Sequence, residues 1–405
     1  MDWLLTNARL SDRMELTNIA IADGRIAQIS PAIPATATQR WDLHGRVVLP
    51  GLVEPHVHLD KTYLNSSGSF PNRSGTLWEA IDVWLVAKKQ RSRADVQAAV
   101  RRALRSAIAH GVTAMRSHVD TEEPSDLETL ATILEVREEF RHAIDLQIVA
   151  LGFAGTSPVI DRAMADALAL GADLVGGAPA LTPDPSASLA ASFALAERFG
   201  KPIDLHIDET EDPASPTLLA LAEMTIAAGM QGQVTAGHCC SLAFMDERDA
   251  GRVIERVAAA GLHIVTLPSC NLVLMGRGMQ PPPRGVTRVK ELLAAGVNVC
   301  AGSDNVQDPF NPFGNYDPLQ SAHFTAHTAH MTGADELAAC REMVTNRAAA
   351  ALGLDGYGLR VGAPADLVVL DTFDPKEAVT APPPRLATFK NGRLVVRTQT
   401  EQEWN

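Results

Sequence analysis

The sequence predicts a (β/α)8 TIM barrel with a small β-sandwich domain formed from both chain ends. Eight strand-like apolar runs alternate with amphipathic helical segments, and short strands with tight turns lie near both ends of the chain. Eight β-then-α units favour a closed parallel barrel over an open sheet. A chain of 405 residues is long enough for such a barrel and one small added domain.

The first fifty residues are typical of a β domain. Leu16 to Ala22 alternates between apolar and polar residues, Asp23-Gly24 is a hairpin turn signal, and Arg25 to Ile29 returns. We therefore assign residues 1–48 to the N-terminal part of the small domain.

The barrel is predicted over residues 49–357. Its strands are expected at Val47–Val53, Val112–Ser117, Leu146–Leu151, Asp173–Gly177, Pro202–His206, Gln233–His238, His263–Leu267 and Asn298–Gly302. Amphipathic helices are expected between them, including Asp95–His110, Asp126–Phe140 and Ala187–Phe199, and two more follow near Leu319–Met331 and Asp335–Leu352. Strands at Val361–Leu370 and Leu386–Val396 then place residues 358–405 in the small domain.

Composition excludes several function classes. The net charge of −13 argues against nucleic-acid binding, which needs a clustered basic surface. Neither a signal peptide nor an apolar run of membrane-spanning length is apparent. Five cysteines without framework spacing predict reduced thiols and a cytoplasmic protein, and Cys239-Cys240 is interpreted as two small residues at a strand end rather than a metal pair.

Residues with metal-binding side chains gather at the predicted strand ends. His56 and His58 lie two apart in an extended segment, so both imidazoles point to one side. His206, His238 and Asp304 end the fifth, sixth and eighth runs. Because barrel enzymes build their sites at the carboxyl ends of the strands, the five side chains predict a metal site.

The motifs around these residues resemble those of the cytosine deaminase-like branch of the amidohydrolase superfamily, which also holds an enzyme acting on N-isopropylammelide. The matching stretches are Glu54-Pro55-His56-Val57-His58-Leu59-Asp60-Lys61, His206-Ile207-Asp208-Glu209, and Arg284 to Glu291 continuing to Ala301-Gly302-Ser303-Asp304-Asn305. The resemblance covers nearly the whole chain, including the flanking strands.

The resemblance implies roles for individual residues. His56, His58, His206 and Asp304 would bind one divalent metal ion, Zn²⁺ or Fe²⁺, between which imidazole and carboxylate ligands do not discriminate. Glu209 matches the proton-shuttling acid, and His238 matches the histidine that polarises hydroxide or substrate. Members of the branch are commonly homo-oligomers.

This chemistry is consistent with the residue types. A metal-bound hydroxide would attack the ring carbon that bears the amino group, and Asp304 would accept the proton from the water. Glu209 would protonate the ring nitrogen and then the departing ammonia, while His238 would stabilise the tetrahedral intermediate. The structural alternative for Glu209 is a first-turn charge of a helix.

Four positions are expected to contact the substrate, and three of them differ from cytosine deaminase proper. Phe153 replaces a glutamine, Asn305 an aspartate and Phe310 a tryptophan. Loss of these polar groups makes cytosine itself a doubtful substrate. The fourth is Lys61, which would hold an anionic substrate group or a neighbouring carboxylate, or else be solvated.

Three further residues are secondary candidates. His118 is interpreted as a support for the metal ligands or as structural, with substrate contact as the alternative. Asn271 and Arg277 are candidates for lining the pocket or ordering its loop.

The leading hypothesis is therefore a hydrolytic deaminase of a small amino-substituted N-heterocycle, such as a cytosine-like pyrimidine, a triazine or a pterin. The alternative is an amidohydrolase that cleaves an N-alkyl substituent or a cyclic amide of a similar ring. A non-catalytic scaffold is the remote alternative, because such relatives typically lose metal ligands and here every position is filled.

Overall fold

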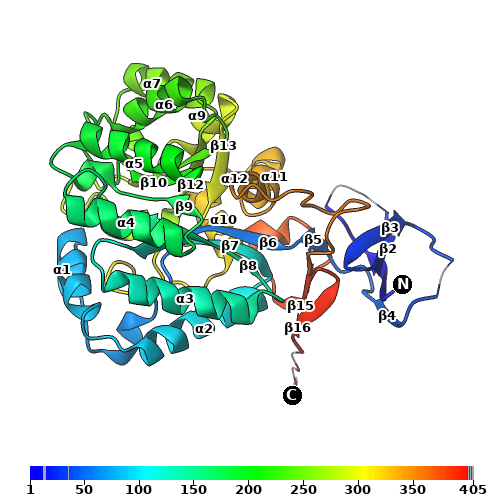
Figure 1. Cartoon of the computed structure of the whole chain (residues 1–405). Coiled ribbons are helices and arrows are strands. Elements are labelled where there is room, and N and C mark those ends of the chain that lie inside the picture. Colours follow the sequence, from blue (N-terminus) through cyan, green and yellow to red (C-terminus); the bar gives the residue numbers. More distant parts are fainter. Residues whose placement is uncertain (12–14, 35, 400, 402, 404–405) are drawn as a thin grey trace.

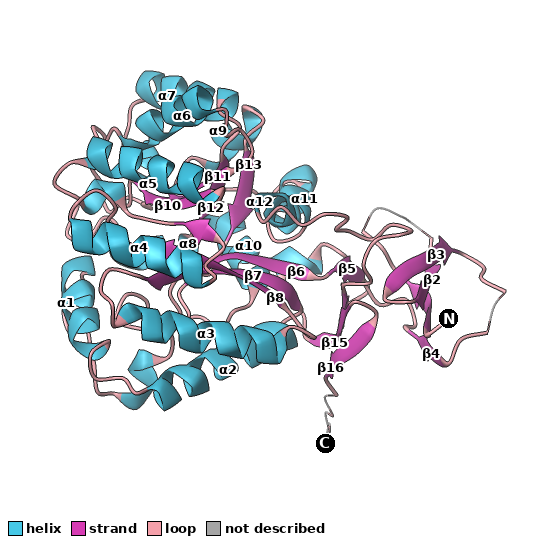
Figure 2. Ribbon diagram, in the orientation of Figure 1, coloured by secondary structure: helices cyan, strands magenta, loops and turns pink. Residues whose placement is uncertain are grey.

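The central element of the computed structural model is a parallel eight-stranded barrel (Figure 2). The structure describes residues 1–405 except 12–14, 35, 400, 402 and 404–405. The barrel strands are β6 (Leu52–Val57), β7 (Val112–Asp120), β8 (Asp145–Leu151), β9 (Leu174–Val175), β10 (Ile203–Ile207), β11 (Val234–His238), β12 (His263–Thr266) and β13 (Asn298–Ala301). They neighbour one another in chain order, and Asp304 N donates to His56 O at 2.9 Å where the first and last strands meet. The predicted barrel is confirmed.

Helices cover the outside of the barrel, so its strands are buried on both faces. The helices that follow the barrel strands are α2 (Arg93–Ala109), α3 (Asp126–Phe140), α4 (Pro158–Leu170), α5 (Pro185–Phe199), α6 (Thr217–Ala228), α7 (Glu247–Ala259), α9 (Val289–Ala294) and α10 (Pro318–Thr328). The additional helices are η1 (Leu64–Ser67), α1 (Leu77–Ala87), η2 (Pro179–Leu181), η3 (Cys240–Ala243), α8 (Pro268–Leu274), α11 (Ala334–Glu342), α12 (Asn346–Ala351) and α13 (Glu377–Thr380). None of the helices among the described residues is both long enough and apolar enough to span a bilayer.

Two four-stranded sheets form the small domain beside the barrel (Figure 1). One contains β1 (Trp3–Ala8), β2 (Thr17–Ala22), β3 (Arg25–Ser30) and β4 (Gln39–Asp42), and the other contains β5 (Val48–Pro50), β14 (Leu367–Leu370), β15 (Arg385–Lys390) and β16 (Arg393–Arg397). Side chains of both sheets, including Leu5, Ile21, Val369 and Phe389, share one buried core. The predicted small β domain from both chain ends is confirmed, whereas its exact boundaries stay a prediction.

The first predicted barrel strand, Val47–Val53, is misplaced. Val48–Pro50 belongs to the small domain, and the barrel strand begins only at Leu52. Between them, a Cβ on Gly51 would lie 2.3 Å from the Thr113 side chain, so the chain passes too close to β7 for any larger residue. One continuous apolar run therefore contains two strands that belong to different sheets, and hydrophobic periodicity alone does not indicate where the first ends.

Two other elements were predicted as single pieces and are divided. Leu386–Val396 is a hairpin of β15 and β16 around Asn391-Gly392, and Asp335–Leu352 contains two helices, α11 and α12. The Asn-Gly pair, with both residues at positive φ, supplies the turn that the strand prediction passed over.

Lys390 links the small domain to the barrel. Its buried Nζ lies 2.6 Å from Oδ2 of Asp145 in β8 and 2.6 Å from Oδ2 of Asp366. We expect Lys390→Met to lower the free energy of unfolding by about 2 kcal/mol, because Asp366 and the half-exposed Asp145 lose a charged hydrogen-bond donor. Denaturant unfolding checks this, with exposed Lys376→Met as the control that should stay at the wild-type value.

Candidate active site

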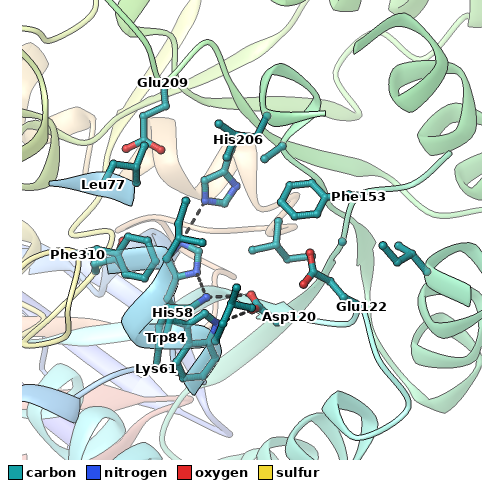
Figure 3. Close-up of a pocket in the computed structure, with 18 of the residues that line it drawn as sticks. His58, Lys61, Leu77, Trp84, Asp120, Glu122, Phe153, His206, Glu209 and Phe310 are labelled. Carbon is teal, nitrogen blue, oxygen red and sulfur yellow. Dashed lines mark hydrogen bonds and ion pairs between the residues drawn. The ribbon is translucent and has the colours of Figure 1, made fainter. Parts of the chain in front are cut away.

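A pocket of about 470 Å³ opens at the carboxyl ends of the barrel strands (Figure 3). Its walls combine charged, histidine, aromatic and aliphatic side chains. All the predicted catalytic residues line it, as do His58, His206 and the four predicted substrate contacts, Lys61, Phe153, Asn305 and Phe310. His56 lies fully buried behind His58.

Strand β6 delivers the first two histidines. His56 and His58 stand two residues apart at its carboxyl end, while Val57 between them packs into the barrel's hydrophobic core. The Nε2 atoms of His56 and His58 lie 3.6 Å and 3.3 Å from Oδ1 of Asp304. The strand alternation therefore directs both imidazoles at the same carboxylate.

His206 and Asp304 complete a compact group. His58 Nε2 lies 3.1 Å from His206 Nε2, and the potential ligand atoms of His56, His58, His206 and Asp304 all lie within 4.8 Å of one another. Asp304 adopts a left-handed backbone conformation with φ of 60°, which turns its side chain into the group. The structure thus brings together the four residues predicted to bind a metal.

The chemistry of this group fits a divalent cation. Both ring nitrogens of His56 and both carboxylate oxygens of Asp304 are buried without a hydrogen-bond partner among the described residues. Such atoms are costly unless something binds them. Burial lowers the pKa of His206 to about 3 and those of His56 and His58 well below the usual range, so the imidazoles are neutral, as metal ligands must be.

Glu209 and His238 lie on one side of this group. Glu209 Oε1 is 3.3 Å from His238 Nδ1, and His238 Nε2 is 4.0 Å from Asp304 Oδ2. Burial, followed by the charge of Asp304, raises the pKa of Glu209 well above the usual range. A carboxyl that holds its proton in a buried site is suited to act as a general acid.

Asn271 contacts His238 rather than the pocket. Its Nδ2 lies 3.0 Å from His238 Nδ1. This contact and that of Glu209 are both made to Nδ1, which leaves Nε2 of His238 facing Asp304. Of its two predicted roles, pocket lining is therefore replaced by orientation of a neighbouring side chain.

Lys61 is buried, with an exposed fraction of 3%. Its Nζ lies 2.9 Å from Asp120 Oδ1 and 3.4 Å from His58 Nδ1, and Trp84 Nε1 donates to the other Asp120 oxygen at 2.6 Å (Figure 3). The solvated alternative is wrong, and Lys61 holds a neighbouring carboxylate. Sequence reasoning missed Asp120 and Trp84, although Asp120 ends a barrel strand.

The remaining predicted substrate contacts lie around the same cavity. Phe153 and Phe310 present rings to it, while Asn305 Nδ2 donates to buried Asp308 Oδ2 at 2.7 Å. Glu122, which sequence reasoning also missed, lines the pocket as well, and burial and then the charge of Asp120 raise its pKa to about 7. Contact of these residues with substrate stays a prediction.

His118 and Arg277 do not line this pocket. The His118 ring lies 4.0 Å from that of His56, and its Nε2 is 3.5 Å from Asp204 Oδ1, which places it behind the histidine group. Arg277 Nη1 donates to the Ser74 carbonyl at 3.2 Å and so connects two loops. These contacts match a supporting role for His118 and a loop-ordering role for Arg277.

Glu54 positions the strand end that carries Asp304. One of its oxygens accepts from Ser303 N at 3.0 Å and the other from Ser303 Oγ at 2.6 Å. A carboxylate directly after the predicted first barrel strand, two residues before His56, was the available sequence signal, but the predictions gave it no role.

Gly237 gives the His56 ring its space. A Cβ there would lie 3.0 Å from His56 Cε1 and 3.2 Å from Nδ1. We expect Gly237→Ala to displace the ring and weaken metal binding about tenfold, the lower range for changes around ligating histidines. Metal titration checks this, and Gly251→Ala in α7, where a Cβ meets no atom within 4 Å, should bind metal as the wild type does.

The barrel, with a group of three histidines and one aspartate at the carboxyl ends of its strands, is typical of metal-dependent hydrolases. The Amidohydrolase family model (Amidohydro_3) matches residues 74–396, and the chain belongs to this family. It is an enzyme that acts on C–N bonds other than peptide bonds, which favours catalysis over the scaffold alternative. Metal dependence is typical of the family.

Individual relatives fit the cytosine deaminase-like branch. A pterin deaminase of Rhizobium rhizogenes is 36% identical over 96% of this chain and 90% of its own. The N-isopropylammelide isopropyl amidohydrolase of Pseudomonas sp. is 30% identical over 98% of both chains. A crystal structure of 5-methylcytosine deaminase from Klebsiella pneumoniae, liganded with phosphonocytosine, aligns with a TM-score of 0.93 at 35% identity, covering 99% of this chain and 100% of that one.

Proposed function

We propose that this enzyme is a metal-dependent hydrolytic deaminase of an amino-substituted N-heterocycle, with a pterin as the first candidate substrate and a 5-substituted cytosine as the second. The observation that carries the proposal is the placement of Glu209 and His238 beside the His56, His58, His206 and Asp304 group at the end of one pocket. The similarity to pterin and 5-methylcytosine deaminases supports the choice of rings.

His56, His58, His206 and Asp304 would hold one divalent ion, Zn²⁺ or Fe²⁺. When bound, such an ion makes a water molecule acidic near neutral pH. Asp304 takes the proton of the attacking water. Glu209 gives its proton to the ring nitrogen beside the aminated carbon, takes up the remaining proton of the added oxygen and delivers it to the departing amino group, which leaves as ammonia. The proton held by Asp304 then returns to Glu209 and restores both groups. The Nε2–H of His238 stabilises negative charge on the oxygen that joins the ring.

A substrate screen on protein loaded separately with zinc and with iron tests the proposal. Pterin, 5-methylcytosine and aminotriazines are incubated with each form, and ammonia is measured. We expect release from at least one ring and from the metal-loaded forms only. Absence of ammonia with all three ring classes contradicts the proposal, and the more active form identifies the metal.

A second candidate is hydrolysis of an N-alkyl substituent or a cyclic amide. Asn305 directly after Asp304 and the similarity to N-isopropylammelide amidohydrolases favour it. Adding an N-alkylaminotriazine to the screen and identifying all products decides, because an alkylamine or a ring-opened acid would then replace ammonia as the product. A cytoplasmic homo-oligomer stays the prediction for the assembled enzyme.

A further inference from the structure

The active-site pocket has two chemically different halves. Histidine, carboxylate and lysine side chains fill the inner half. The partly exposed Glu122 and Glu123 also line the pocket, and three elements that are not barrel strands, α1, η2 and α4, make its outer half. Its aliphatic residues are Leu77, Ile81, Leu85, Val159, Ile160 and Leu181. Leu77 and Glu209 line the same cavity, so the aliphatic residues share one pocket with the catalytic groups (Figure 3).

The aliphatic residues at the pocket mouth are poorly explained by packing. Leu85, Val159 and Leu181 are 40%, 61% and 38% exposed, although each lines the pocket. A side chain that remains this exposed contributes little to the hydrophobic core. Exposed apolar side chains that converge on one cavity from separate elements are typical of ligand contacts.

The volume of the pocket also exceeds what the proposed reaction requires. Pockets that enclose drug-sized ligands measure roughly 300–1,000 Å³, and this one is about 470 Å³. A small ring held beside Glu209 and the histidines occupies only the inner half. An unsubstituted ring would therefore leave the aliphatic wall in contact with water.

We infer that the outer half is a subsite for an apolar substituent, so that the preferred substrate is an aminated ring carrying an alkyl or aryl group. This rests on the proposed function for the position of the ring. The substituent removes Leu85, Val159 and Leu181 from water, and each buried methylene strengthens binding about three- to fourfold.

Two homologous series test the inference: 6-alkylpterins and 5-alkylcytosines, each from hydrogen to n-butyl. The kcat/KM for ammonia release is measured along each series. Dissociation constants of the corresponding oxo products, the 6-alkyllumazines and 5-alkyluracils, are measured by calorimetry on the zinc-loaded enzyme. We expect a gain of about three- to fourfold per methylene on at least one ring.

Matched double variants locate the effect. Leu85→Asn with Val159→Asn changes the aliphatic wall, and we expect the gain per methylene to fall below about twofold. Val86→Asn with Leu170→Asn changes residues of comparable exposure, 53% and 48%, in the same two helices, and neither of them lines the pocket. The control pair should keep the wild-type gain.

The possible failures can be told apart. If no ring releases ammonia, the proposed function fails, while the calorimetric series still tests the subsite. The subsite is overturned if neither kcat/KM nor the dissociation constants improve with alkyl length on either ring. It is also overturned if the wall variants leave the gain per methylene unchanged. A wall variant that dissociates an oligomer without altering the gain also overturns it, because the patch is then an interface between copies of the chain.

Discussion

Glu209→Gln lowers kcat by about 10²–10⁴-fold, the range for loss of a positioned general acid. Glutamine has nearly the same shape and can still contact His238, whose Nδ1 lies 3.3 Å from the carboxylate. It cannot, however, deliver a proton to a ring nitrogen or to a departing amine. The loss should therefore appear in kcat, whereas KM and the metal content stay near the wild-type values.

Steady-state kinetics and metal analysis of the same preparation check this expectation. Glu223→Gln, an exposed change in α6, serves as the control and should keep wild-type kcat. A Glu209→Gln enzyme that retains more than about a tenth of wild-type kcat would remove Glu209 from its assigned role.

His56→Ala is expected to abolish stoichiometric metal binding together with activity. His56 is fully buried, and its Nε2 faces the carboxylate of Asp304 at 3.6 Å. Its removal leaves two histidines and one aspartate of the four residues that would hold the ion. We expect kcat/KM to fall by about 10⁴-fold or more, since the attacking water loses the ion that lowers its pKa.

Elemental analysis after dialysis against excess metal provides the readout. His263→Ala is the matched control, because His263 starts β12 and so lies at the opposite end of the barrel from the site. That variant should retain one ion per chain. A His56→Ala protein that binds metal as tightly as the wild type would show that the four-residue group is not the metal centre.

The residues at the strand ends were predictable because barrel geometry constrains them strongly. Once the strand that ends at Ile207 and the strand that ends at His238 are located, their carboxyl ends must meet around one opening. The predictions therefore brought together His206, His238 and Asp304 despite their separation along the chain. Errors of a few residues in the strand boundaries do not change this prediction, because the direction and order of the strands determine which side chains meet.

Other parts of the site depend on contacts that sequence patterns do not encode. Trp84 reaches Asp120 only because α1 is placed over the pocket, and no periodicity indicates where an extra helix will lie. Glu54 supports Ser303 across the seam where the first and last barrel strands meet. The left-handed backbone of Asp304 is likewise imposed by tertiary contacts rather than by aspartate itself.

Turnover of an aminated ring in isotopically labelled water is the most direct test of hydrolytic deamination at this site. The zinc- or iron-loaded enzyme should convert the ring to a product that contains one labelled oxygen at the former amino position, with one equivalent of ammonia released. A product that keeps its ring amine, or one formed equally by the metal-free His56→Ala protein, would contradict the assignment.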